Sequence, residues 1–288
     1  MILKKCNLTA ATFITLRFAY CIISSFDLNL LMETKLILSD LDETLLRSDK
    51  TISDYSVRIF EKCRQRGILV GFCTSRGKPN IIPFENKINP DICICNGGAS
   101  IYHNGSLLYA SSFNIEETNS ILDRARTVCG SECEITVDTI DKIFWNREKD
   151  KSTDYADNSI YDDFLNFTLP AMKICVQTDD SEKAKEIARS VSSCDFLPFS
   201  DIPWYKFSPA SATKENAISI LCKKLDISPK EILAFGDDFN DIGMLKLCGK
   251  GIAMGNAISQ VKAAADGMTK TNNEDGVAWY LENFILKD

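Results

Sequence analysis

Short apolar segments that end in polar residues recur along the chain from Lys35 onward. Their consecutive apolar positions are typical of strands that are buried on both faces of a parallel sheet. The expected strands, each with the polar residues that follow it, are Leu36–Leu38 with Ser39 and Asp40, Ile68–Cys73 with Thr74, Ser75 and Arg76, Ile92–Cys95 with Asn96, Gly97 and Gly98, Ile232–Phe235 with Gly236, Asp237 and Asp238, and Gly251–Met254 with Gly255 and Asn256.

Amphipathic helices are expected between these strands. Ser53 is a suitable N-cap for a helix that ends at Gly67, and Asp275 is expected to begin a last helix. A further apolar stripe is formed by Ala217, Ile220, Leu221 and Leu225. Alternating strands and helices predict a doubly wound parallel α/β sheet. Ligands bind at the carboxyl ends of the strands in such sheets, so the polar residues after the strands are expected to meet at one edge.

A different pattern occupies the middle of the chain and predicts a second α/β domain inserted into the first. Its expected helices are Asn114–Cys129, Asp154–Phe167 and Ser181–Val191, and its expected strands are Glu132–Val137, Lys142–Trp145 and Met172–Gln177, the first two paired antiparallel. Before the insert, Asn104-Gly105 predicts a tight hairpin within Ser100–Phe113. We therefore expect an N-terminal extension (1–33), a first core part (34–113), an α/β cap (114–207) and a second core part (208–288).

The first residues differ from the rest. Two basic residues precede two apolar runs, Leu8–Leu16 and Phe18–Phe26, which Arg17 separates. Neither run has the roughly 18 apolar residues that a membrane-spanning helix needs. Three interpretations stay open: a dispensable extension with the true start at Met32, a signal or anchor segment, or a packed helix.

Composition excludes several classes of protein. The chain has 288 residues and a net charge of −7, which argues against nucleic-acid binding and requires local cations to attract an anionic substrate. Its 12 Cys are too sparse for a disulfide scaffold and favour a reducing, cytoplasmic compartment. His103 is the single histidine, so a mechanism that needs two histidines is excluded.

Two carboxylates stand directly after the first buried strand, at Asp40 and Asp42. Neighbouring carboxylates are costly unless a proton or a cation neutralises them, and a hard divalent cation with oxygen ligands would do so. A carboxylate can also accept a phosphoryl group covalently. We expect Asp40 to attack phosphorus and Asp42 to act as general acid and then general base. The alternative is that Asp40 starts a turn and Asp42 caps a helix.

Hydroxyls and a lysine could hold the phosphate. Thr74 and Ser75 follow a strand, where hydroxyl and backbone N–H groups can bind phosphate, although an N-cap role is the simpler alternative. Lys214 begins a predicted helix, where the macrodipole does not favour a cation, so an anionic neighbour is expected. A surface position is the alternative for this lysine.

A second acidic group follows the strand Ile232–Phe235 in the sequence GDDFNDIGML. Asp237 stands at a strand end, as Asp40 does, and the two are expected to form an oxygen cage for Mg²⁺. A loop with an Asx turn is the alternative.

Together these motifs resemble the haloacid dehalogenase superfamily of phosphatases, in its Cof-type branch, subclass IIB. The resemblance spans Lys35–Leu281 and rests on DLDETLL, CTSR, Lys214 in SATKENAI, and GDDFNDIGML, with NGG, IAMGNA and EDGVAWYL in support. Two departures are Glu43, where the family commonly has Gly, and Ser75, where it commonly has Gly before the arginine.

The resemblance implies a Rossmann-like core with a large α/β cap between the second and third motifs. It implies Mg²⁺ at Asp40, the backbone carbonyl of Asp42, and Asp237, with Asp241 supporting the lysine or the metal. The implied phosphate and substrate contacts are Thr74, Ser75, Arg76, Asn96, Gly97, Lys214 and Asn240.

We therefore expect Mg²⁺-dependent hydrolysis of small phosphate monoesters, such as sugar phosphates, through an aspartyl phosphate. A phosphomutase or phosphotransferase that uses the same aspartate is the enzymatic alternative, and a non-catalytic regulatory homologue is the alternative of another class. A membrane cation pump with similar aspartate chemistry is excluded because no transmembrane helix is predicted. Oligomeric state is not predicted.

Overall fold

The computed structural model describes residues 34–147, 158–199 and 202–287. Lys35–Asp288 forms a compact unit by itself. The predicted N-terminal extension, with its three interpretations, lies outside the described residues.

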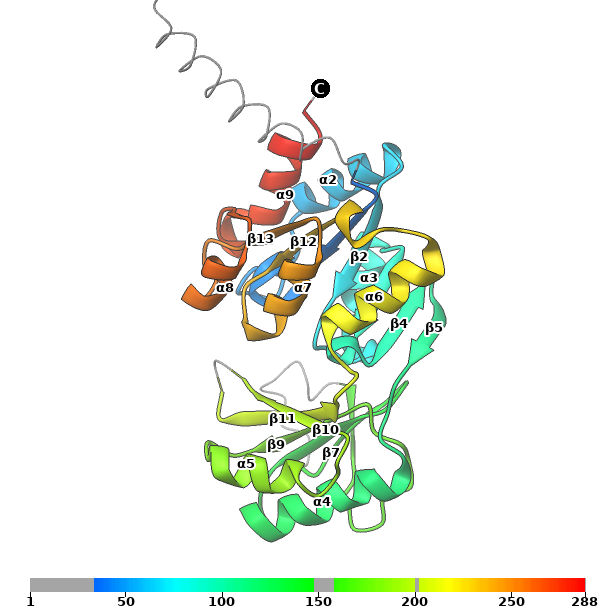
Figure 1. The fold of residues 1–288 in the computed structure, drawn as a ribbon, viewed down its shortest axis with the longest axis vertical. Coiled ribbons are helices and arrows are strands. Elements are labelled where there is room, and N and C mark those ends of the chain that lie inside the picture. The colour runs from blue at the N-terminus through cyan, green and yellow to red at the C-terminus, as the bar shows by residue number, and fades with distance from the viewer. Residues whose placement is uncertain (1–33, 148–157, 200–201, 288) are drawn as a thin grey trace, which may run out of the picture. The chain divides into compact units, whose positions relative to one another are not determined.

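An eight-stranded sheet forms the core, in the order β14-β13-β12-β1-β2-β3-β4-β5 (Figure 1). Six of its strands are parallel, and β4 and β5 add an antiparallel hairpin at one edge. The strands are β1 (Leu36–Ser39), β2 (Leu69–Cys73), β3 (Ile92–Cys95), β4 (Ser100–His103), β5 (Ser106–Ala110), β12 (Ile232–Gly236), β13 (Lys250–Ala253) and β14 (Gly267–Met268). The predicted parallel strands and the hairpin at Asn104-Gly105 are confirmed.

Helices cover the core sheet in two layers (Figure 1). In one layer α2 contacts α9, and in the other α6 contacts α7, which contacts α8. The core helices are α2 (Asp54–Gln65), α3 (Ile82–Ile88), α6 (Lys214–Leu225), α7 (Ile242–Leu247), α8 (Ser259–Ala264) and α9 (Gly276–Tyr280). Ser53 caps α2 as predicted, by accepting a hydrogen bond from the Ser56 backbone N–H. Within the described ranges, none of the helices has the length and apolar content needed to cross a bilayer.

A second sheet of six strands lies between the two core segments of the chain, in the order β10-β11-β9-β6-β7-β8. Helices α4 (Ile115–Cys129) and α5 (Ser181–Ala188) accompany it. The strands are β6 (Ile135–Asp138), β7 (Ile143–Trp145), β8 (Ser159–Tyr161), β9 (Lys173–Gln177), β10 (Cys194–Pro198) and β11 (Trp204–Pro209). Strand β11 therefore continues past residue 207, the predicted end of the cap.

The expected helix Asp154–Phe167 is wrong over its described part. From residue 158 the chain forms β8 and then turns. The carboxylates of Asp162 and Asp163 accept hydrogen bonds from the backbone N–H groups of Phe164 and Leu165, respectively. Such local bonds offer the backbone an alternative to helix formation. Strands β10 and β11 were not predicted either.

The cap sheet has one apolar face and one mixed face, because side chains alternate along each strand. Residues on the apolar face pack in a cluster with α4 and α5, and they include Ile135, Val137, Ile174, Val176 and Phe207. The other face carries the intervening residues, which include Thr136, Asp138, Lys173, Cys175, Trp204 and Lys206. Figure 1 shows α4 and α5 on one side of this sheet.

A buried ion pair lies on the mixed face. Asp138 and Lys173 are register partners on β6 and β9, each is 1% exposed, and their charged groups lie 3.0 Å apart. The Lys173 ammonium also donates a hydrogen bond of 2.9 Å to the backbone carbonyl of Ser75, in the loop after β2. The pair therefore connects the cap to the core loop of Ser75, which the sequence predicts to bind phosphate.

We expect Lys173→Met to lower the free energy of unfolding by about 3–5 kcal/mol, because it leaves the Asp138 carboxylate buried without its partner charge. Urea unfolding followed by circular dichroism measures the change. The double variant Lys173→Met/Asp138→Leu should regain at least about half of the loss, since it removes both charges. A single variant as stable as the wild type would contradict this account of the pair.

Candidate active site

Residues that follow three core strands line one cavity of about 330 Å³. Asp40 follows β1, Thr74 follows β2, and Asp237 follows β12, while Lys214 is the first residue of α6. The full lining is Asp40, Asp42, Glu43, Lys50, Thr74, Ser75, Arg76, Phe199, Ile202, Lys214, Asp237, Asp238, Asn240 and Asp241. The parallel strands bring these chain-distant residues together at their carboxyl edge, as expected for a doubly wound sheet.

Lys214 lies at the centre of the polar contacts in this cavity. Its ammonium donates hydrogen bonds of 2.7 Å to Asp40 Oδ1 and 2.6 Å to Asp241 Oδ1, and the residue is 3% exposed. Burial opposes the charge of Lys214, but the carboxylates of Asp241 and Asp40 outweigh burial and raise its pKa above the ordinary value. Lys214 is therefore a permanent cation in this site, and the expectation of an anionic neighbour is met by two carboxylates.

Three carboxylates crowd together beside Lys214. One carboxylate oxygen from each of Asp40, Asp237 and Asp241 lies within 4.8 Å of the others. Burial, assisted by neighbouring carboxylates and opposed by Lys214, raises the pKa of Asp40 to about 7. Burial and the charges of Asp40 and Asp241 raise the pKa of Asp237 to about 8. These groups resist ionisation, so the cluster has a strong electrostatic need for a further cation.

Asp241 is committed to structural contacts on both of its oxygens. Oδ1 accepts from Lys214, and Oδ2 accepts from the backbone N–H groups of Asp237 and Asp238 at 2.9 and 3.1 Å. Gly236 permits this arrangement, because a Cβ there would lie 2.4 Å from the Asp241 Cβ. Asp241 therefore orients the loop that carries Asp237 and fixes the position of Lys214.

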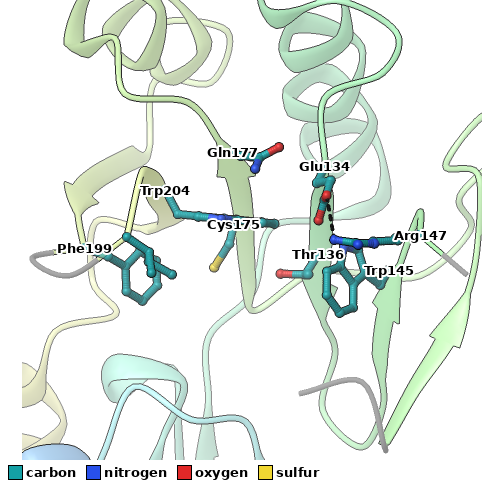
Figure 2. A pocket seen from close by; sticks show the side chains of 9 residues that line it. Glu134, Thr136, Trp145, Arg147, Cys175, Gln177, Phe199 and Trp204 are labelled. Atoms are coloured by element: carbon teal, nitrogen blue, oxygen red, sulfur yellow. Dashed lines mark hydrogen bonds and ion pairs between the residues drawn. The ribbon is translucent and has the colours of Figure 1, made fainter. Parts of the chain in front are cut away.

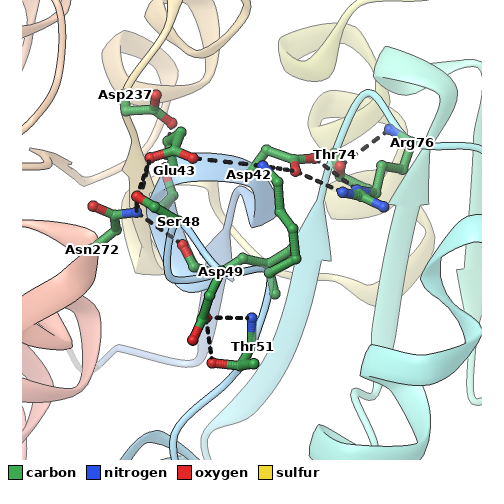
Figure 3. Close-up of polar contacts among 12 residues, drawn as sticks. Asp42, Glu43, Ser48, Asp49, Thr51, Thr74, Arg76, Asp237 and Asn272 are labelled. Atoms are coloured by element: carbon green, nitrogen blue, oxygen red, sulfur yellow. Dashed lines mark hydrogen bonds and ion pairs between the residues drawn. The ribbon is translucent and has the colours of Figure 1, made fainter. Parts of the chain in front are cut away.

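Asp42 is held by two cations, Lys50 and Arg76, of which Figure 3 labels Arg76. The Arg76 guanidinium donates two hydrogen bonds of 2.7 Å to the two oxygens of Asp42, and Lys50 donates one of 3.2 Å. Burial alone would raise the pKa of Asp42, but the contacts with Arg76 and Lys50 outweigh it and lower the pKa. Asp42 is therefore an ionised carboxylate in this conformation.

Glu43 has a backbone conformation that glycine adopts more readily, which fits the Gly expected here from the resemblance. Its φ of 52° lies in the left-handed region, which a residue with a side chain adopts at some cost. Contacts with other residues hold it there: its carboxylate accepts hydrogen bonds from Ser48 and Asn272 (Figure 3). Its backbone carbonyl accepts one from Asn256. The tight turn between Asp42 and Thr44 is thus kept without glycine.

The remaining predicted site residues divide into two groups. Thr74, Ser75 and Asn240 line the cavity. Asn96 and Gly97 do not line it; Asn96 is fully buried and its amide lies 3.5 Å from the sulfur of Met172 in the cap. The backbone N–H groups of Asn96 and Gly97 donate hydrogen bonds of 2.8 and 3.0 Å to the carbonyls of Arg76 and Thr74, so this pair supports the loop after β2 without lining the cavity.

Several residues at the site were not predicted. Thr44 donates a 2.6 Å hydrogen bond to Asp237 Oδ1, and Lys50 contacts Asp42. From the cap, Lys206 donates a 3.2 Å hydrogen bond to Asn240 Oδ1, and Phe199 and Ile202 line the cavity. Thr44 lies within the DLDETLL motif, so the motif itself was a usable signal, whereas the cap residues have no motif.

Comparison with known proteins identifies the family of the chain. The family model of haloacid dehalogenase-like hydrolases matches residues 37–281. The 5-amino-6-(5-phospho-D-ribitylamino)uracil phosphatase YitU of Bacillus subtilis is 28% identical, over 88% of this chain and 99% of that protein. A haloacid dehalogenase-like hydrolase from Bacteroides thetaiotaomicron has a similar solved structure, with a TM-score of 0.76 and 26% identity over 87% of this chain and 99% of its own.

A subclass IIB sugar phosphatase of the same superfamily shares the fold, with a TM-score of 0.76 and 23% identity over 88% of this chain and all of its own. The family match covers both core segments and the cap between them. The chain therefore belongs to the haloacid dehalogenase-like hydrolases, as an enzyme of the phosphatase type with the Cof-type, subclass IIB fold.

Proposed function

We propose that this enzyme hydrolyses small phosphorylated metabolites, such as sugar phosphates, in the cytoplasm, with Mg²⁺ as cofactor and Asp40 as nucleophile. The observation that carries the proposal is the gathering of Asp40, Asp237 and Asp241 around the buried Lys214. A carboxylate at a strand end, beside a fixed cation and a cation site, fits phosphoryl transfer.

The chemistry of the donor set fits Mg²⁺. Asp40 and Asp237 offer carboxylate oxygens, the backbone carbonyl of Asp42 lies in the same turn, and Mg²⁺ prefers oxygen ligands from few carboxylates with water completing its shell. Burial and neighbouring carboxylates raise the pKa values of Asp40 and Asp237 despite the presence of Lys214, which supports a site for a further cation. Bound Mg²⁺ would supply positive charge that stabilises both the ionised carboxylates and the phosphoryl oxygens.

The phosphate group would lie against Thr74, Ser75, Lys214 and Asn240. These residues border the same cavity as Asp40. Lys214 supplies a fixed positive charge, and the hydroxyl and amide groups supply hydrogen bonds, so the anion is attracted locally although the chain is acidic overall. Charge in the transition state spreads over the phosphoryl oxygens, where these groups stabilise it.

The reaction then follows from two carboxylates. Asp40 attacks phosphorus, the bond from phosphorus to the substrate oxygen breaks, and Asp42 gives that oxygen a proton. Water next attacks the aspartyl phosphate while Asp42 takes its proton, which frees inorganic phosphate and restores Asp40. Asp42 is ionised and held by Arg76 before substrate binds, so it must take a proton from solvent before the first turnover; in later turnovers it keeps the proton that it takes from the attacking water. Arg76 also lines the cavity, so the entering phosphate would compete for its guanidinium and release Asp42.

Asp40→Asn should lower kcat on an aryl phosphate by at least about 10³-fold, because the amide is a poor nucleophile. The fold should be kept, since Asp40 already resists ionisation. Release of inorganic phosphate measures the rate. Asp49→Asn is the matched control: Asp49 is exposed, and within the described part of the chain its carboxylate accepts hydrogen bonds from Thr51 alone, so its loss should leave kcat within about twofold. Wild-type turnover by Asp40→Asn would overturn the nucleophile assignment.

Stability in the presence of a chelator should depend on pH. The pKa values of Asp40 and Asp237 in the folded state are about 7 and about 8, above the ordinary 3.8. From pH 3.8 up to these raised values, the folded state therefore binds more protons than the unfolded state. Their stabilising contribution is complete below pH 3.8 and is lost as pH rises towards 8. The urea midpoint in EDTA should therefore be lower at pH 8 than at pH 6, and Asp237→Asn should reduce this difference.

Mg²⁺ should restore the midpoint at pH 8 more than at pH 6, because protons compete with the cation for the same carboxylates. Removal of Mg²⁺ should also stop phosphate release. Two results would contradict the cation site: full activity in excess chelator, or a midpoint that Mg²⁺ shifts equally in the wild type and in Asp237→Asn.

A further inference from the structure

A second cavity of about 290 Å³ lies on the mixed face of the cap sheet (Figure 2). Its walls are aromatic: Trp145 on β7, Trp204 on β11, and Phe199 before β11. The floor between them is made of the small side chains Thr136 and Cys175, which are register partners on β6 and β9. Figure 2 shows Phe199 and Trp145 on opposite sides of the cavity with Cys175 and Thr136 between them.

This aromatic cavity adjoins the catalytic cavity, because Phe199 and Ile202 line both. Strand β11 also runs from one to the other. Trp204 lies in the aromatic cavity, and Lys206, two residues along on the same face, contacts Asn240 of the catalytic cavity. A molecule with its phosphate at Asp40 would therefore present its other end to the aromatic walls.

The chemistry of the walls selects the occupant. Indole and phenyl rings stack best on another planar ring. The charged residues at the rim neutralise each other, since Arg147 lies 3.0 Å from Glu134 in an ion pair, and the Arg147 guanidinium lies 5.9 Å from the Trp145 ring centre. A second anionic group is thus not favoured here, whereas an uncharged planar ring is.

The indole N–H of Trp145 also favours a ligand of this kind. Among the described residues, the indole nitrogen of Trp145 has no hydrogen-bond partner, although the residue is only 8% exposed. A buried donor without a partner is costly, and a ring with an acceptor atom on its edge would supply one. The carboxamide of Gln177, which also lines the cavity, offers both a donor and an acceptor to such an edge.

We propose that this cavity binds a planar, uncharged heteroaromatic ring carried by the alcohol part of the phosphate ester. This inference rests on the proposed function for the phosphate end of the substrate. It assigns the choice of substrate to the tryptophans of β7 and β11.

A matched pair of substrates tests the proposal. Uridine 5′-monophosphate and ribose 5-phosphate both carry a phosphate on the 5′ carbon of ribose, but only the first carries a planar ring. Wild-type kcat/KM should be at least tenfold higher for the nucleotide. Trp145→Leu and Trp204→Leu should each lower the ratio of the two kcat/KM values by about fivefold to tenfold, through loss of ring stacking.

Trp279→Phe is the control, because Trp279 packs against Phe284 and Lys270 in the core and should keep the ratio unchanged. Trp204 is half-buried, so its variant keeps the test available if Trp145→Leu fails to fold. A ratio near one in the wild type, or a ratio that neither cap variant changes, would overturn the proposal.

Binding of uridine itself separates this proposal from the proposed function. Uridine should quench the tryptophan fluorescence of the full chain, less in Trp204→Leu and equally in Trp279→Phe. Quenching without any phosphate release from either ester would support the ring site and sink the phosphatase proposal. Phosphate release without quenching or preference would do the reverse.

Discussion

The buried contact of Lys214 with Asp40 and Asp241 is the constraint on which the site depends. Three carboxylates within 4.8 Å of one another would repel strongly in a buried place. Lys214, at the start of α6, neutralises part of this charge and lies between the end of β1 and the loop after β12. Burial, together with the carboxylate charge that Lys214 leaves uncompensated, keeps the pKa values of Asp40 and Asp237 high, and this is the physical reason to expect a divalent cation.

The two faces of the cap sheet have different roles beside this charged site. One face packs on α4 and α5 and stabilises the domain. The mixed face turns from charged to aromatic along its strands: Asp138, Lys173 and Lys206 contact each other or core loops, while Trp145 and Trp204 line the adjoining cavity. The alternation of side chains along a strand thus gives both the packing of the cap and the groups that face the substrate.

Topology made much of the site predictable. Asp40, Thr74 and Asp237 each follow a buried apolar run, and the rule that parallel strands present their carboxyl ends together was enough to group these three; Lys214 was added from its place at a helix start and from the family resemblance. The pairing of Asp42 with Arg76 was not predictable, because the partner of a long side chain depends on how two separate loops approach. Asn96, which also follows a strand, is turned towards Met172 of the cap instead, and strand position alone does not reveal this.

The cap was less predictable than the core. Its strand β8 was expected to be helical, because the residues around it have helical periodicity while pairing beside β7 decides the outcome. Strand β10 is partly exposed, and β11 has polar residues among its aromatic ones, so the apolar pattern of both is weak, although β11 carries Trp204 and Lys206. Trp204 and Lys206 contribute to the site because both lie on the mixed face of the cap sheet. Which residues lie on that face depends on the register of β11 with β10 and β9, and the sequence alone does not give this register.

The central claim is that Asp40 carries the phosphoryl group during turnover. Rapid mixing of the enzyme with Mg²⁺ and an aryl phosphate, followed by an acid quench and peptide mass spectrometry, tests it most directly. The account predicts a transient phosphoryl group on the peptide that contains Asp40, formed before free phosphate accumulates. Phosphate release at full rate with no modified peptide, or with the phosphoryl group on another residue, would contradict it.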